Sequence, residues 1–471
     1  MPDEKEKTVA DPCDAYMSMR PIWNKCRAIC AGEEAVKSHD TLVTDEDNFL
    51  VPFSPSMSQV QYDFLKREAE LPGVTSEFAH LLVGSLLRRE PEVSCETAPE
   101  GAIDWIVQEF GADSSPLVSF MDNLLWEEVT VTRGWTFVDY SGELPYPVSW
   151  KAESVINWRH TNKALTMVIV AVLEEVTATN EFHPTTRTVY HVHEVVEGAY
   201  QIRRFVKKSD NDYEVLGPPS VPLMFDKPLA YIPAWPNNGE VDPVLPFLLV
   251  LINKEIALYN KITRRNHLLY NASTYTPYTI GVEETAFKKI VQAGLGSWLN
   301  LPEGAEIGVL KAPTESLADL EKSIAAGFEE MAKLGVRMLS PENSQSGVAL
   351  QLRNASQTAR VGIMNTRIGV IMRQVIAFMI NWRYGTEVKA EDVKFDLQSD
   401  FSMYTRDDAW LRIITEWYEN GHIPRSIWVR ILRNSEALPD DYNDDDGLLE
   451  IAKSENFAKT YLEKIDASED Q

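Results

Sequence analysis

Apolar residues recur at intervals of three and four positions along several stretches of the chain, which is the spacing of one face of an α-helix. In the stretch that starts at Ser316, Leu317, Leu320 and Ile324 keep this spacing. Asp319, three residues after Ser316, resembles the acidic member of a capping box. The pattern predicts helices within 58–90, at 246–271, from Ser316 onward, at 348–384 (the longest), and at 403–434, where Asn420 and Gly421 divide two helices.

Between residues 127 and 232 the pattern changes to β-branched and alternating runs, which predict strands. One run is apolar throughout, as in a buried strand, and two others alternate on either side of a Glu-Gly pair, as in a hairpin. We therefore expect an α+β domain with a mainly antiparallel sheet. The predicted strands are 134–138, preceded by 129–132, then 167–173, and the pair 188–195 and 200–205 that flanks Glu197 and Gly198.

Several segments have no sustained apolar period. Residues 1–50 are polar and charged, and we expect them to form a flexible or loosely docked arm. Residues 217–246 hold eight prolines, and because proline fixes φ and lacks an N–H donor, they predict an extended connector. Residues 340–347 (SPENSQSG) have the composition of a loop, and the tail after Pro439 is rich in aspartate.

Two of the predicted helices bracket a small β-rich excursion, with short strands at 275–281 and 296–301 and a turn at 302–304. The helix before the excursion ends in a basic cluster, which would also favour the helix dipole. The longest helix carries a row of arginines, which predicts a solvated face, intersubunit ion pairs or transient contact with nucleic acid. The basic residues are Lys261, Arg264, Arg265 and His267 in the cluster and Arg353, Arg360, Arg367 and Arg373 in the row.

Length and charge limit the functions to be considered. The 471 residues suit two to four folded units, since one hydrophobic core rarely serves so long a chain. The chain has 45 basic and 71 acidic residues, a net charge of −26. Tight general binding of DNA needs Lys and Arg at the phosphates, so this balance disfavours it. Solubility alone would also account for the charge.

Four cysteines are too few for a disulfide framework in a chain of this length, and we expect free thiols in a reducing compartment. The first residues, MPDEKEKTVADP, have no apolar segment of the kind found in a signal peptide. Nor does the sequence hold a run of about 18 uncharged apolar residues. We therefore expect a soluble, intracellular protein without a membrane partner. The cysteines are Cys13, Cys26, Cys30 and Cys95.

The motifs of common enzyme classes are missing from the sequence. It has no phosphate-binding G-x-x-x-x-G-K-[ST], no complete dinucleotide-binding glycine motif and no G-x-S-x-G elbow. His191 and His193, two residues apart on a predicted strand, project to one face and could bind a metal with His183 or Glu194 nearby. Glu194 points the other way on an ideal strand, and such His pairs are common without metal. We expect no cofactor, no metal and no catalytic residue.

Three short motifs stand at defined places in the order of elements: 146–159 (YPVSWKAESVINWR), 198–205 (GAYQIRRF) and 346–350 (SGVAL), which opens the longest helix. The order itself is arm, α+β domain, proline-rich connector, long helix, β excursion, long helix, loop, longest helix and helical C-terminus. Over about residues 50–434 this resembles the portal proteins of tailed bacteriophages. The nearest resemblance is to a branch known only as a domain of unknown function.

The resemblance implies a phage portal fold within the α+β class: an α/β wing, a two-helix stem, a small β-rich clip, a long tunnel-side helix and a helical crown. The implied divisions are an N-terminal arm at 1–50, wing at 51–245 and 351–402, stem helices at 246–271 and 314–337, clip at 272–313, tunnel loop at 338–350, and crown with acidic tail at 403–471.

The resemblance also implies where this chain would meet its partners. The tunnel loop would face DNA, the clip would dock terminase or an adaptor, and the basic cluster would mark one end of the stem. The tunnel-loop residues are Glu342, Asn343, Ser344, Gln345 and Ser346; the clip residues are Tyr278, Glu283, Glu284, Lys288, Lys289, Trp298 and Glu303; the stem residues are Lys261, Arg264, Arg265 and His267.

The implied function is a non-enzymatic, dodecameric ring at one capsid vertex, the channel for DNA packaging and ejection. Its partners would be other copies of itself, terminase, a head–tail adaptor, the major capsid and scaffolding proteins, and transiently double-stranded DNA. It would lie at the portal vertex of the virion, and in the host cytoplasm during assembly. Two alternatives are a metal-dependent enzyme or ligand-binding domain at His191 and His193, and another structural ring such as a head–tail adaptor.

Overall fold

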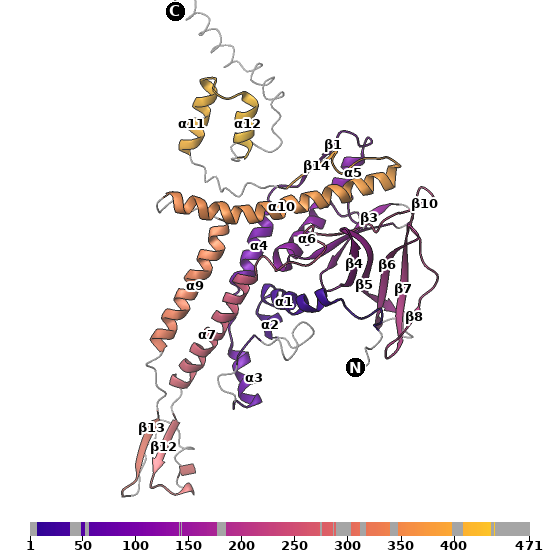
Figure 1. The fold of residues 1–471 in the computed structure, drawn as a ribbon. Helices are drawn as coiled ribbons and strands as arrows, with labels where there is room; N and C mark the ends of the chain where they lie inside the picture. Colours follow the sequence, from indigo (N-terminus) through magenta and orange to yellow (C-terminus); the bar gives the residue numbers. More distant parts are fainter. Residues whose placement is uncertain are drawn as a thin grey trace, which may run out of the picture. The chain divides into compact units, whose positions relative to one another are not determined.

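The computed structural model describes residues 7–37, 49–51, 56–140, 142, 144–176, 185–273, 276–285, 287–288, 303–310, 317–339, 347–397, 408–434 and 438. Within helices α9 and α10, side chains are described up to Leu334 and from Val361 onward. The chain divides into two compact units, Met1–Phe401 and Ser402–Gln471. Unit 1 combines helices with antiparallel sheets, which confirms the α+β class (Figure 1).

Two antiparallel sheets form the strand-rich part of unit 1. The hairpin turn lies at Glu197 and Gly198, whose φ angles of 53° and 81° suit a tight turn, so the predicted hairpin is confirmed. The sheets meet where Trp135 contacts Trp158, with ring centroids 6.0 Å apart. The five-stranded sheet contains β4 (Val155–Thr161), β5 (Ala164–Val176), β6 (Thr185–Val196), β7 (Ala199–Ser209) and β8 (Asp212–Val215); the three-stranded sheet contains β11 (Ala234–Pro236), β2 (Gly134–Tyr140) and β3 (Pro145–Lys151).

The N-terminal segment differs from the expectation of a loosely docked arm. Helix α1 (Asp14–Ala31) buries Trp23 and Ile29 completely, and α2 (Glu33–Lys37) follows it. Cys26 and Cys30 are buried in α1, where desolvation raises the pKa of each thiol to about 12, and all four cysteines are free. The expectation was wrong because the buried residues of α1 keep helical spacing (Tyr16, Met19, Trp23, Cys26 and Cys30), a short period within a segment that is otherwise polar and charged.

Residues 129–132 were expected to form a strand, but residues up to Val131 belong to helix α6 (Leu117–Val131). Val129 and Val131 are both fully buried in that helix. Strand propensity of β-branched residues is weak compared with burial, and here the tertiary environment overrides it. The strand itself begins at Gly134, as predicted.

The proline-rich segment is more than a connector. Its β11 pairs with β2, and two shorter strands, β9 (Leu223–Met224) and β10 (Lys227–Pro228), pair with each other. Asn237 and Asn238, just after β11, are fully buried. The segment is therefore part of the body of unit 1, by which we mean helices α1 to α6 and the sheets formed by strands β2 to β11.

Helices α3 (Gln59–Glu68) and α4 (Val74–Leu86) confirm the helices predicted within 58–90. Helix α5 (Ala102–Gln108) was not predicted. Ser58 caps α3 through a capping box with Gln61. Strand β1 (Glu92–Cys95) pairs with β14 (Val393–Asp396), which joins residues about 300 positions apart in the sequence.

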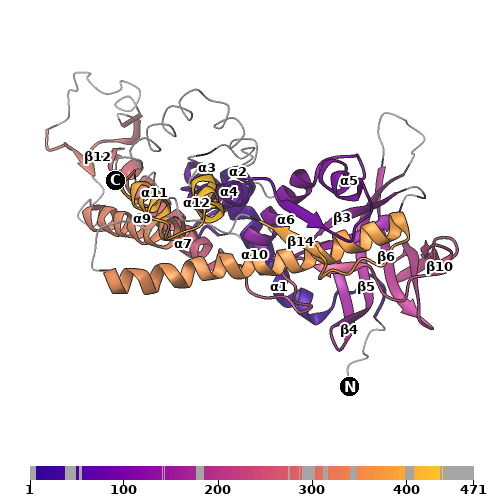
Figure 2. The same cartoon turned by 90° about the horizontal axis from the view of Figure 1, so that it is seen from above.

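Helix α10 (Gly347–Tyr384) is the longest element and confirms the predicted helix at 348–384. In both views it runs from the α7–α9 helices to the sheets (Figure 2). Its part Val361–Tyr384 is long and apolar enough to cross a membrane, but 67% of that segment is buried within the protein. Core helices have the same composition, and this helix contacts β2, β3 and β14.

Two long helices and a hairpin form the rest of unit 1 (Figure 1). Helix α7 (Leu249–Ser273) has 25 residues, about 38 Å at the rise of an α-helix. Strands β12 (Thr276–Ile280) and β13 (Glu306–Leu310) follow, and then α9 (Leu317–Leu339). β12 confirms the first predicted strand of the excursion, β13 was not predicted, and the strand expected at 296–301 lies outside the described residues.

In unit 2, the structure describes helices α11 (Asp408–Glu419) and α12 (Arg425–Asn434). The rings of Tyr418 and Trp428 stack at 4.6 Å and hold the two helices together. Gly421 has a φ of 73°, so the predicted break at Asn420 and Gly421 is confirmed.

Candidate functional site

The α7–α9 pair is antiparallel and closely packed. Lys254 Nζ donates to Glu330 Oε1 (2.8 Å), and Lys261 Nζ donates to Ser323 Oγ (2.9 Å). Between these contacts Leu258 lies against Gly327, where an added Cβ would come within 2.4 Å of Leu258 Cδ2. The glycine is therefore needed for close approach of the two helices, and the three contacts fix their register.

The start of α7 is anchored in the body. Glu255 is fully buried, and its Oε2 accepts a hydrogen bond from the backbone N–H of Thr75 in the first turn of α4 (2.8 Å). This carboxylate thus caps a helix whose own N-cap residue, Gly73, has no side chain to do so. Asn260 donates to the carbonyl of Phe49, and Lys25 donates to Asn253. Helix α7 therefore leaves the body at a fixed position.

The β12–β13 hairpin holds part of the predicted clip site. Tyr278 is 45% exposed, and its ring lies over Gly308 on the opposite strand, where a Cβ would be 2.2 Å from Tyr278 Cζ. Glu283, Glu284 and Lys288 are exposed beyond β12, with Lys288 paired to Glu284 at 2.8 Å. Glu303 is exposed before β13. Lys289 and Trp298 lie outside the described residues.

The predicted basic end of α7 does not converge on one site. Lys261 is engaged with Ser323, and the guanidinium of Arg265 donates to Asn266 Oδ1 at 3.1 and 2.8 Å. Arg264 is exposed, and His267 is half-buried, with its pKa lowered by desolvation. Of the four residues, Arg264 thus has the most exposed side chain.

The predicted tunnel-loop residues, Glu342 to Ser346, lie outside the described part of the chain. The structure shows the helices on either side, since α9 ends at Leu339 and α10 begins at Gly347. Of the arginine row, Arg367 pairs with Glu240 at 3.1 Å and Arg373 donates to the carbonyl of Gly369. The side chains of Arg353 and Arg360 are outside the described residues.

His191 and His193 project from the same face of β6, as predicted, with ring centroids 6.4 Å apart. Their ring nitrogens have other contacts: His193 Nδ1 lies 2.7 Å from the hydroxyl of Tyr200, and His191 Nε2 lies 3.3 Å from Glu174 Oε1. Burial lowers the pKa of His193 to about 3, and it is therefore neutral. Among the described residues, no group of three or more His, Cys, Asp or Glu side chains could hold a metal ion.

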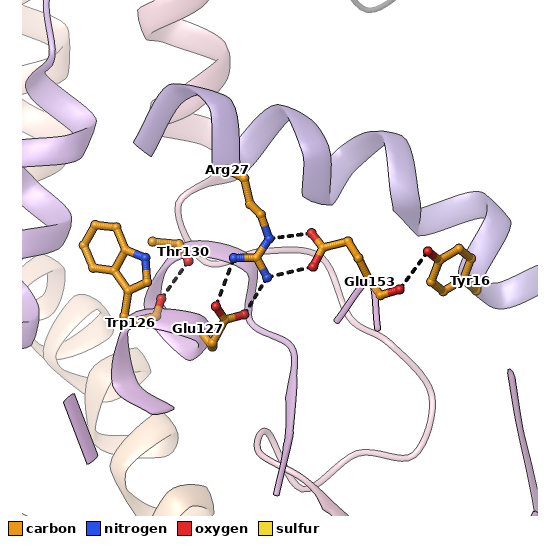
Figure 3. Close-up of polar contacts among 6 residues, drawn as sticks. All are labelled: Tyr16, Arg27, Trp126, Glu127, Thr130 and Glu153. Carbon is orange, nitrogen blue, oxygen red and sulfur yellow. Dashed lines mark hydrogen bonds and ion pairs between the residues drawn. The ribbon is translucent and has the colours of Figure 1, made fainter. Parts of the chain in front are cut away.

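A buried ion cluster, not foreseen from the sequence, joins α1 to the rest of the body (Figure 3). The guanidinium of Arg27 donates to both oxygens of Glu127 (3.0 and 2.5 Å) and to both oxygens of Glu153 (2.5 and 2.8 Å). Although burial opposes the charged guanidinium, these hydrogen bonds raise the pKa of Arg27. Glu153 lies in the motif 146–159, but nothing in the sequence connects it with a residue 126 positions earlier.

Two more buried charged residues, Glu128 and Arg133, lie near the end of α6 without a direct ion pair between them. Glu128 is 2% exposed, and desolvation raises the pKa of its carboxyl to about 7 despite the nearby Arg133 and Arg367. Arg133 is fully buried, and burial lowers its pKa to about 10. Its guanidinium donates to the carbonyls of Glu240 and Val241 and lies 4.5 Å from the ring centroid of Trp135. These contacts hold the segment after β11 against the body.

A known protein family matches the helix–hairpin–helix part of the chain. Residues 247–383 match the family described as "Domain of unknown function (DUF4055)", a range that includes α7, the hairpin, α9 and nearly all of α10. No curated protein matches the chain.

Three similar solved chains come from gene transfer agent (GTA) particles. One, from the virion of the native particle, is 11% identical, with 80% of this chain and 93% of that chain covered and a TM-score of 0.39. One, from the neck of the empty particle computed with C6 symmetry, is 12% identical, with the same coverage and TM-score. One, from the neck of the native particle computed with C12 symmetry, is 11% identical over 80% and 95% of the two chains, with a TM-score of 0.37. The family match over residues 247–383, and not these solved chains, confirms the resemblance to the branch known as a domain of unknown function.

Proposed function

We propose that this protein is a portal subunit: one copy of a homo-oligomeric ring at a capsid vertex, through which DNA is packaged and ejected. The observation that carries the proposal is the projection made of α7, the β12–β13 hairpin and α9, anchored in an α+β body and followed directly by α10. In this order of elements the sequence resembles phage portal proteins.

In this proposal each part of the chain has a role. Residues 51–245 are the wing, completed by 351–402, and α7 and α9 form the stem. The hairpin region at 272–313 is the clip, which docks terminase during packaging and head–tail connector proteins afterwards. The segment between α9 and α10, within the predicted 338–350, is the tunnel loop facing DNA, and 403–471 form the crown and acidic tail.

The charge of the chain supports a conduit in preference to a DNA-gripping protein. Phosphate contacts by Lys and Arg are strong and additive, so a lumen lined with many of them would hold DNA in place. The chain carries a net charge of −26, and three of the four residues of its predicted basic cluster are half-buried along α7. Such a ring lets DNA slide, and its movement requires energy from a separate motor.

The first test is the mass of the full-length protein in solution, followed by negative-stain electron microscopy. We expect a closed ring with a central hole, and a particle mass that is an integral multiple of the 53.3 kDa subunit. A monomer at micromolar concentration would contradict the proposal, especially if it bound zinc and lost that binding in the His191→Ala variant.

A second test concerns the clip. Replacement of residues 276–310 by a short glycine–serine linker should leave ring formation intact, because these residues lie beyond the anchored part of α7, and should abolish capture of terminase. The matched control is Tyr278→Ser, which changes one exposed side chain and keeps the hairpin. Capture of terminase by rings without the hairpin would show that docking occurs elsewhere.

A further inference from the structure

Helix α7 has a stripe of exposed residues, of which Asn253 accepts a hydrogen bond from Lys25 of α1. Val250, Asn253, Ala257 and Arg264 are exposed and follow one another at spacings of three, four and seven, so they share one face of the helix. Val250 is 59% exposed. This face is separate from the line of Lys254, Leu258 and Lys261 that meets α9.

Helix α9 has an exposed stripe of its own. Glu321, Ala325, Phe328 and Ala332 are exposed and recur at spacings of three and four. Phe328 is 38% exposed, although the adjacent Gly327 is packed against Leu258. The stripe lies on the side of α9 that turns away from its contact with α7.

The register of the helix pair sets the heights of these two stripes. In the contacts Lys254–Glu330, Leu258–Gly327 and Lys261–Ser323, the residue numbers rise along α7 as they fall along α9. The same register places Ala257 level with Phe328, and Arg264 level with Glu321. At 100° per residue, however, Ala257 and Arg264 project to one side of the pair and Glu321 and Phe328 to the other. They therefore do not meet within one chain.

From this arrangement we infer that the exposed face of α7 in one copy of the protein packs against the exposed face of α9 in the next copy. The inference rests on the proposed ring. Rotation about an axis that runs along the helices keeps every residue at its own height, so Arg264 of one copy comes level with Glu321 of its neighbour, and Ala257 with Phe328. The phenyl group of Phe328 then meets the small side chain of Ala257, and the guanidinium of Arg264 meets the carboxylate of Glu321.

The charges of the two helices are complementary along their length. α7 carries Lys254, Lys261, Arg264 and Arg265, and its one acidic residue, Glu255, is fully buried. The described part of α9 carries four acidic residues against two lysines; these are Asp319, Glu321, Glu329 and Glu330 against Lys322 and Lys333. Opposite charge favours α7 against α9 and disfavours like helices side by side.

The geometry also fixes the type of interface. Because the two stripes differ and lie on opposite sides of the pair, the contact is head-to-tail, and such contacts close into rings when the rotation permits. A symmetric dimer would instead place each stripe against itself, with Arg264 near Arg264.

Cysteine cross-linking of the full-length protein tests the interface. In the double variant Ala257→Cys/Phe328→Cys, a short bismaleimide should link each copy to two neighbours and give a ladder of bands up to the full ring. The two single variants, co-expressed, should give dimers and no higher bands. Wild-type protein treated in the same way controls for the four native cysteines, of which Cys13 and Cys95 are half-buried.

Charge reversal supplies a second measurement that does not depend on cross-linking. Arg264→Glu should shift the subunit concentration at half-assembly upward by about tenfold, Glu321→Arg should do the same, and the double reversal should restore most of the loss. Lys208→Glu, an exposed reversal on β7, is the matched control and should leave assembly unchanged.

The outcomes separate the two proposals. Rings that form in the wild type but show neither the ladder nor a loss with Arg264→Glu would overturn this interface and leave the proposed function standing. Loss with both single reversals but no recovery in the double variant would overturn the pairing of Arg264 with Glu321. A wild-type protein that never assembles would overturn the proposed function itself.

Discussion

The body of unit 1 and the α7–α9 pair use charged residues in opposite ways. In the body, the side chains of Arg27, Glu127 and Glu153 are 11%, 7% and 21% exposed, and these three ions pair with one another within the chain. Along the helix pair, Lys254 and Glu330 are 44% and 54% exposed, and most other charges also face outward. The body is thus complete by itself, whereas the helix pair presents surface suited to other molecules. Mutations should therefore act on stability in the body and on assembly along the helices.

The largest effect on stability is expected from Arg27→Ala. The substitution leaves Glu127 and Glu153 close together and partly buried without a cation, which costs about 3–5 kcal/mol of unfolding free energy. Chemical denaturation followed by tryptophan fluorescence measures it. Lys25→Ala, two residues away and bonded to Asn253, should cost less than about 1 kcal/mol. Equal losses in the two variants would mean that the ion cluster has no special role.

Glu128→Gln should change the dependence of stability on pH. The folded-state pKa of Glu128, about 7, lies above its ordinary value of 4.5, so the folded state binds this proton more tightly than the unfolded state. The resulting stability is fully present below pH 4.5 and is lost as the pH rises through 7. The neutral glutamine keeps this stability at all pH values. Between pH 4.5 and pH 8 the free energy of unfolding of the variant should therefore come to exceed that of the wild type by up to about 3 kcal/mol. Glu387→Gln, at an exposed position, should show no such gain.

Two glycine substitutions compare a packed helix with an open one. Gly327→Ala forces a methyl group against Leu258 and should destabilise the protein by about 1–3 kcal/mol. Gly362→Ala in α10, where nothing lies within 4 Å of the added Cβ, should stabilise it by about 1 kcal/mol through helix propensity. Thermal unfolding measures both. The double variant Leu258→Ala/Gly327→Ala should lose less than the sum of the two single losses, because the shortened side chain removes the clash, and additive losses would place the clash elsewhere.

The smallest effect is expected for the exposed Lys254–Glu330 pair. A double-mutant cycle with alanine should give a coupling energy of about 0.2–1 kcal/mol, decreasing as salt is added. A coupling above 2 kcal/mol that salt does not change would indicate that the helix pair is shielded from solvent in the assembled state.

The helical regions were predictable because their signal is local. Each apolar stripe in α7, α9 and α10 repeats often enough to be recognised, and the hairpin around Glu197 and Gly198 is defined by neighbouring residues. The strand expected at 129–132 failed for the opposite reason, since a short β-branched run is compatible with a buried helix as well as with a strand. Helix α1 was not predicted although Tyr16, Met19, Trp23 and Cys26 keep helical spacing, because this period is confined to one short part of a polar segment.

By itself, then, the sequence determined the order of the elements, the antiparallel α+β class, the acidic charge and the resemblance to portal proteins. Local periodicity, turn residues and composition carry that information. Only the tertiary structure decided that Arg27 joins Glu127 and Glu153, that Glu255 caps α4, and that Gly327 sets the register of α7 against α9. Such contacts join residues tens to hundreds of positions apart, and their energy depends on burial and on distances of a few ångströms, which no local pattern of residues encodes.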